Sequence, residues 1–72
     1  MAVGDRIRLA RKEAGLTQEG LARRTGLTLK AVGELERGDV QDPHVSSLRE
    51  IARALDTTVG ELLEEPAVPL AS

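Results

Sequence analysis

Several residue types that commonly stabilise or activate small proteins are missing from this 72-residue chain. It has no cysteine, which excludes disulfides and thiolate metal sites. It also has no Phe, Tyr or Trp. Any core must therefore be aliphatic, and an aromatic stacking platform for single-stranded nucleic acid is disfavoured. The one histidine, His44, is too little for a histidine-based site, and we interpret it as a surface cap or loop residue.

Long apolar runs are also missing. No stretch approaches the roughly 20 apolar residues of a membrane span, and the N-terminal sequence MAVGDRIR lacks the apolar centre of a signal peptide. We therefore expect a cytoplasmic protein without a membrane partner. The chain shows no nucleophile–base pair, glycine-rich phosphate loop or metal-binding cluster. We therefore expect no enzymatic activity, no cofactor and no metal.

The length of the chain allows one domain. A domain of this size buries only about 60% of its unfolded surface, and such scaffolds usually need a disulfide, a metal or oligomerisation. With the first two excluded, either oligomerisation or well-packed helices must supply the stability.

Charge is distributed unevenly along the sequence, although the formal net charge is only −2. Residues 1–38 carry eight basic and five acidic side chains, a balance of +3, whereas residues 39–72 carry two basic and seven acidic ones, a balance of −5. This asymmetry suits a half that faces a polyanion and a half that faces solvent or a partner. Ordinary solvated helix faces would also explain it.

Apolar residues recur at helical spacing in five segments. The predicted helices span about residues 3–14, 18–25 and 29–37, then a segment that opens near Pro43, and a last one that follows Thr58 and ends before Pro66. Pro43 can occupy the first position of the fourth helix, with Asp42 as its cap. The side chains expected to face the core are Val3, Ile7, Ala10, Ala14, Leu21, Ala22, Ala31, Val32, Leu35, Val45, Leu48, Ile51, Ala52 and Leu55, with Val59, Leu62 and Leu63 as the apolar residues of the last helix.

The stretch from Leu16 to Gly38 predicts two short helices joined by a tight turn at Gly26. Thr17 and Thr28 each precede a helix and suit an N-cap role. Apolar residues flank each cap at the spacing of a hydrophobic staple, in the pairs Leu16 with Leu21 and Leu27 with Val32. Two capped helices with a glycine-containing turn form a helix-turn-helix, whose second helix can enter a DNA major groove.

This stretch resembles the Cro/C1-type helix-turn-helix of phage repressors and small bacterial regulators. The matching residues are Thr17-Gln18-Glu19, Leu21-Ala22, Gly26, Thr28, Val32, Leu35-Glu36-Arg37-Gly38, Pro43, Leu48, Ile51-Ala52, Leu55 and Leu62-Leu63. The resemblance covers roughly residues 3–64. It implies an all-α, compact five-helix, lambda-repressor-like DNA-binding domain over residues 1–65. Residues 66–72 form a tail that is either flexible or docks on a second subunit.

The function that the resemblance implies is that of a transcriptional regulator. It would bind double-stranded DNA sequence-specifically as a homodimer on a palindromic operator, and repression is the expected outcome. Cro-like phage proteins, antitoxin-type regulators and restriction-modification controller proteins are of similar size. An alternative from another class is a protein-interaction module, for example antitoxin-type, that keeps the fold but has weak DNA affinity.

The candidate DNA-binding residues lie at the start of the first helix of the motif and along the second. They are Thr17, Gln18, Thr28, Leu29, Lys30, Gly33, Glu34 and Arg37. We expect Leu29, Lys30, Gly33 and Glu34 to point outward and to read bases. Lys30 can donate to guanine or to phosphate, Leu29 can contact a thymine methyl group, and Glu34 can accept from cytosine. Leu29 is equally consistent with a protein interface.

The remaining candidates concern the DNA backbone and the support of the motif. The positive end of the helix that starts at Gln18 suits a phosphate, and Thr28 can cap its helix and also touch a phosphate. The resemblance implies backbone contacts for Gln18 and Arg37, a bracing ion pair between Arg11 and Glu36, and a cap role for His44 in place of Asp42.

Overall fold

The computed structural model describes residues 2–40 and 42–63, which form five helices and no strand. The helices are α1 (Val3–Glu13), α2 (Gln18–Thr25), α3 (Leu29–Arg37), α4 (Val45–Ala54) and α5 (Val59–Leu62). The tail predicted at residues 66–72 lies outside the described residues. The expected all-α, five-helix fold is confirmed within the described ranges, and none of the described helices is long and apolar enough to span a membrane.

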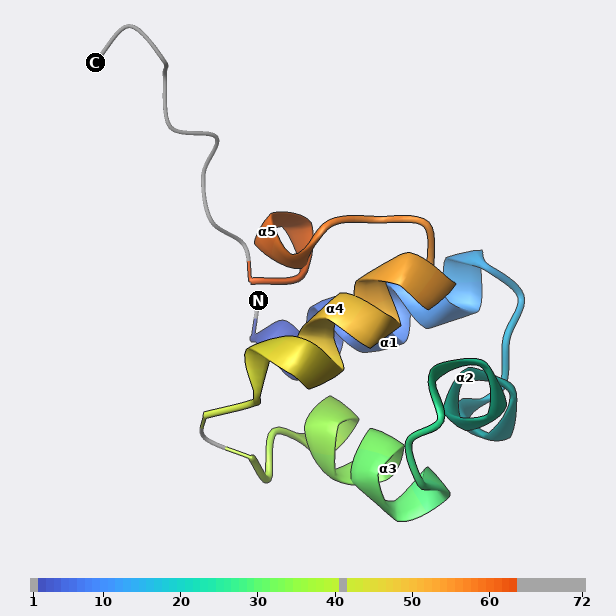
Figure 1. The fold of residues 1–72 in the computed structure, drawn as a ribbon, viewed down its shortest axis with the longest axis horizontal. Helices are drawn as coiled ribbons and strands as arrows, with labels where there is room; N and C mark the ends of the chain where they lie inside the picture. Colours follow the sequence, from blue (N-terminus) through green and yellow to red (C-terminus); the bar gives the residue numbers. More distant parts are fainter. Residues whose placement is uncertain (1, 41, 64–72) are drawn as a thin grey trace, which may run out of the picture.

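The helices enclose one aliphatic core. Figure 1 shows α4 crossing in front of α1, with α2 and α3 together at one side of this pair and α5 at the other. Contacts join α1 to α3 and α5, and α2 to α3 and α4. The buried apolar side chains are Ile7, Leu21, Ala22, Val32, Leu35, Leu48, Ile51, Ala52, Leu55 and Leu62. Residues predicted to face inward from every helix therefore meet in one cluster.

Local sequence signals set where the helices begin and end. The hydroxyls of Thr17, Thr28 and Thr58 accept hydrogen bonds from backbone N–H groups three residues ahead, at 3.0, 3.0 and 3.1 Å. These bonds confirm Thr17 and Thr28 as N-caps and give Thr58 the same role in α5. Gly26 ends α2 with φ +77°, a left-handed conformation that glycine adopts without steric cost. The helices α2 and α3 therefore have the predicted bounds.

Three of the expectations made from the sequence are wrong in detail. Helix α4 begins at Val45 after His44, so Asp42 does not cap it and Pro43 is not its first residue. Val45 is 57% exposed because it is the outermost residue of α4, one turn before Leu48, where that helix reaches the core. Ala14 is also exposed, because α1 ends at Glu13 and the chain turns away there.

Gly4 permits the close contact between α1 and α3. A Cβ atom at this position would lie 2.6 Å from the Glu36 carbonyl oxygen and closer still to that of Leu35. Both atoms belong to the backbone of α3 and cannot rotate away. The absence of a side chain at Gly4 therefore sets the distance between α1 and the C-terminal turn of α3.

Replacing Gly4 with Ala should lower stability, because α1 would have to move away from α3. Overpacking of this kind costs about 1–3 kcal/mol. Gly20→Ala is the matched control, since its Cβ would meet nothing closer than 3.4 Å and a helical Ala is favoured by up to about 1 kcal/mol over Gly. Urea unfolding should therefore give free-energy changes of opposite sign for the two variants. Two changes of the same sign would contradict this account of Gly4.

Candidate nucleic-acid interface

The helix α2, the turn at Gly26 and the helix α3 form the helix-turn-helix predicted from the sequence. The N-cap hydroxyls of Thr17 and Thr28 are on exposed residues at the N-terminal ends of α2 and α3. Each helix end carries a partial positive charge that favours an anion such as a phosphate. The motif thus presents two positive helix ends and the outer surface of α3 on the same segment of chain.

The outer surface of α3 combines one apolar and two basic side chains. Leu29 is 47% exposed, and the Lys30 side chain is 86% exposed. Lys30 Nζ lies 3.9 Å from Glu34 Oε1, one turn further along the helix. Arg37 is exposed at the end of α3. Leu29 and Lys30 are therefore accessible as predicted, whereas Glu34 is only partly exposed.

Gly33 differs from the prediction in its accessibility, because it lies on the outer side of α3 but is buried. The cause is Arg37, whose Nη1 lies 3.1 Å from the place that a Cβ on Gly33 would occupy. Arg37 therefore covers the position where Gly33 was expected to be open.

A shallow hollow brings together candidates from both helices of the motif. It is lined by Arg11, Leu16, Thr17, Gln18, Glu19 and Leu29. Thr17 and Gln18 begin α2, whereas Leu29 begins α3, so a single surface joins the predicted phosphate side to the predicted base-reading side.

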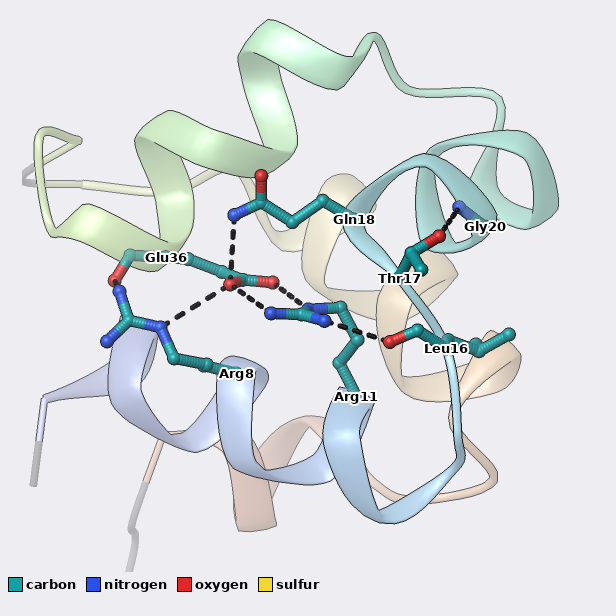
Figure 2. Close-up of polar contacts among 7 residues, drawn as sticks. All are labelled: Arg8, Arg11, Leu16, Thr17, Gln18, Gly20 and Glu36. Carbon is teal, nitrogen blue, oxygen red and sulfur yellow. Dashed lines mark hydrogen bonds and ion pairs between the residues drawn. The ribbon is translucent and has the colours of Figure 1, made fainter.

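Behind this surface, the carboxylate of Glu36 is held by three side chains (Figure 2). Arg11 makes two hydrogen bonds to it, from Nε to Oε2 at 2.6 Å and from Nη2 to Oε1 at 3.1 Å. Gln18 Nε2 donates to Oε1 at 3.2 Å, and Arg8 Nε lies 3.5 Å from the same oxygen. The bracing pair between Arg11 and Glu36 is thereby confirmed, and it is part of a larger cluster.

The Glu36 cluster also binds backbone groups at both ends. Arg8 Nη2 donates to the Glu36 carbonyl oxygen at 3.2 Å, and Arg11 Nη1 donates to the Leu16 carbonyl oxygen at 2.8 Å. The contacts fix the C-terminal turn of α3 and the segment that leads into α2 against the same face of α1.

Comparison with known proteins identifies the family. The family model described as Helix-turn-helix matches residues 7–62. The chain belongs to the Cro/C1-type helix-turn-helix family of transcriptional regulators.

Two curated relatives illustrate this family. The domain is 39% identical over 59 residues to the uncharacterized HTH-type transcriptional regulator YazB of Bacillus subtilis (strain 168), covering 82% of this chain and 84% of YazB. It is 38% identical over 65 residues to the immunity repressor protein of Bacillus phage phi105, covering 90% of this chain. The chain spans only 44% of that repressor's length.

Solved structures agree with the fold. The P22 c2 repressor in complex with a synthetic operator matches with a TM-score of 0.83 and 27% identity, covering 92% of this chain and 98% of that one. A SinR/SinI protein complex matches with a TM-score of 0.84 and 32% identity, covering 88% of this chain and 61% of that one.

The electrostatics of the Glu36 cluster follow from its burial. Removal from water alone raises the pKa of the Glu36 carboxyl, but the hydrogen bonds from Arg11 and Gln18 and the charges of Arg11 and Arg8 more than offset this. The pKa of Glu36 therefore lies below its ordinary value, and the carboxylate is ionised at neutral pH. The helix-turn-helix domain thus contains a buried, ionised carboxylate directly behind its candidate interface.

Two participants of the site were not foreseen from the sequence. Arg8 was not assigned to Glu36, although its place three residues before Arg11 puts both on one face of α1. Asp39 was treated as a loop residue, but its Oδ2 accepts a hydrogen bond from Arg37 Nε at 3.0 Å. Gln18 was expected to contact the DNA backbone, and in this structure its amide donates to Glu36.

Replacing Arg11 with Ala should destabilise the domain far more than Lys12→Ala. Without Arg11, the fully buried carboxylate of Glu36 keeps only Arg8 and Gln18 as partners. Breaking a buried ion pair in this way costs about 3–5 kcal/mol of stability. Lys12 is exposed in the same turn, and surface substitutions usually change stability by less than about 0.5 kcal/mol. Thermal unfolding at neutral pH measures both, and similar shifts in melting temperature would refute the bracing role.

Acid should weaken the domain through Glu36. Because the pKa of Glu36 is lower in the folded chain, its contribution is complete above the unfolded pKa of about 4.3. It is lost as pH falls through the folded pKa. Melting temperatures of the native chain and of Glu36→Gln, measured from pH 7 to pH 3, should differ most at neutral pH and converge in acid. A gap that is constant across this range would contradict the assignment.

Proposed function

We propose that this chain is a sequence-specific, double-stranded DNA-binding transcriptional regulator that acts as a homodimeric repressor. In this proposal α3 lies in the major groove and the N-terminal end of α2 lies on the DNA backbone. The observation that carries it is the helix-turn-helix itself. The outer surface of α3 is accessible, and the C-terminal turn of α3 is anchored by Glu36. The similarity to the operator-bound P22 c2 repressor supports the proposal.

Six of the eight candidate residues divide into two groups within this proposal. Thr17, Gln18 and Thr28 contact phosphates, since all three lie at the N-terminal ends of α2 and α3. Lys30 and Glu34 face base edges, Lys30 as a donor and Glu34 as an acceptor, and Leu29 packs on a thymine methyl group. In this proposal these residues contact DNA in the cytoplasm of a bacterial host.

Dimerisation is the second element of the proposal. Two copies of α3 about 34 Å apart would read half-sites one helical turn apart, which implies a palindromic operator. The partly exposed Leu63, directly after α5, favours a second subunit on the α5 side.

The test is selection from a pool of random DNA duplexes at near-physiological salt, using the full chain. A palindromic consensus would support the dimeric regulator. A single, non-repeated half-site would contradict the dimer but not DNA binding. If a folded protein selects no sequence, the regulator proposal fails, and the protein-interaction module becomes the better hypothesis.

Salt distinguishes DNA binding from an apolar protein interface at the same surface. A domain that neutralises phosphates releases counterions, so its affinity falls steeply as salt rises. Association through the exposed Leu29 would change little with salt. An affinity for duplex DNA that does not depend on salt would contradict the proposed mode of contact.

Replacing Lys30 with Ala should weaken operator binding about 5- to 10-fold and leave the fold intact, because its side chain is exposed on the outer surface of α3. Arg53→Ala is the matched control. Arg53 is an exposed cation on α4 that lies 3.8 Å from an acid of its own helix, Glu50, much as Lys30 lies near Glu34. Fluorescence anisotropy with the selected operator measures both variants. Equal effects, or none for Lys30, would remove this residue from the interface.

A further inference from the structure

Gly33 and Arg37 occupy one side of α3, one helical turn apart. A long side chain on a helix runs back over the turn that precedes it. Arg37 does so, and its Nη1 lies 3.1 Å from the position that a Cβ on Gly33 would occupy. The guanidinium of Arg37 therefore lies beside Gly33, one turn back along the outer side of α3, and not at the C-terminal end of the helix where its Cα lies.

A second contact holds the guanidinium from the other side. Arg37 Nε donates to Asp39 Oδ2 at 3.0 Å, across the turn made by Gly38. Both side chains are more than half exposed, 58% for Arg37 and 55% for Asp39, so the ion pair adds little stability. Its effect is on the direction of the guanidinium, because Nε points to Asp39 while Nη1 lies on the side of Gly33.

We propose that Arg37 reads a base, with the O6/N7 edge of a guanine in the major groove as its ligand. Gly33 and Asp39 are positioning residues that place and orient its guanidinium. The inference rests on the proposed function and deepens it, since the resemblance by itself implied only a backbone contact for Arg37. The planar guanidinium presents paired N–H donors that match the two acceptors of guanine.

The charge around Arg37 favours a base over a phosphate. A phosphate contact gains nothing from a carboxylate 3.0 Å away, because Asp39 repels the same anion that Arg37 would attract. A guanine edge carries no net charge and suffers no such repulsion.

The experiment compares the full native chain with Arg37→Ala on three kinds of duplex. These are the selected operator, its single base-pair variants and an unrelated duplex of equal length. On the operator, we expect Arg37→Ala to lose about 5- to 150-fold in affinity, the range of a bidentate base contact. We expect the variant to lose its preference at one G·C pair in each half-site, while its affinity for unrelated DNA changes much less. Arg53→Ala is again the control and should keep the preference.

Two outcomes overturn the inference. A uniform loss on every duplex, with a salt dependence shallower by about one counterion, would identify Arg37 as a phosphate ligand. Unchanged operator affinity would remove it from the interface. If the native chain binds no duplex at all, the proposed function has failed, which is a different result from either of these.

The positioning residues are tested by changes that leave Arg37 in place. Gly33→Ala should hold or raise the melting temperature, because Ala favours the helix, yet reduce the preference at the same G·C pair by displacing the guanidinium. Asp39→Ala should reduce that preference, because Arg37 Nε loses its acceptor, and should strengthen binding to unrelated DNA, because one repelling charge is lost. If either variant keeps the full preference at that pair, its positioning role is refuted.

Discussion

The buried carboxylate of Glu36 determines how the first three helices fit together. An ionised group without exposed surface is tolerated only where partners neutralise it. These partners come from α1, through Arg8 and Arg11, and from the start of α2, through Gln18 (Figure 2). The helix that carries the candidate interface is thus tied to both of its neighbours by one charge. The close backbone contact at Gly4 lies beside the same turn of α3, so packing and electrostatics fix the same junction.

In this arrangement the side chain and the backbone of Gln18 face different partners. Its side chain completes the shell of Glu36, while its backbone lies in the first turn of α2, where the partial positive charge favours an anion. The contacts of Glu36 would therefore set the position, relative to α3, of an anion bound there. A surface network would be weaker and more sensitive to salt, because exposed ion pairs contribute little. The domain has a small aliphatic core, and the buried cluster supplies the rigidity that a DNA-binding surface requires.

The sequence predicted those features that depend on neighbouring residues. Threonine caps, the glycine turn and the bounds of α2 and α3 are local, so the spacing of a few residues was sufficient. The Arg11–Glu36 pair lies 25 residues apart and was available only through resemblance to a family. The burial of Gly33 was missed because it depends on where the Arg37 side chain lies, which helical spacing alone does not decide. Val45 was misplaced because the α4 pattern does not show where that helix leaves the core.

The charge balance of the domain bears on how a regulator of this kind would choose its site. Both basic side chains of α3 stand near acids: Lys30 lies 3.9 Å from Glu34, and Arg37 lies 3.0 Å from Asp39. Non-specific affinity for DNA comes from phosphate neutralisation, and these acids reduce it. The phosphate attraction is common to specific and non-specific binding, so the net charge of −2 lowers both affinities and leaves the base contacts to set the ratio between them. A weakly attracted monomer then gains most from a second subunit, because two linked half-sites multiply the discrimination of each.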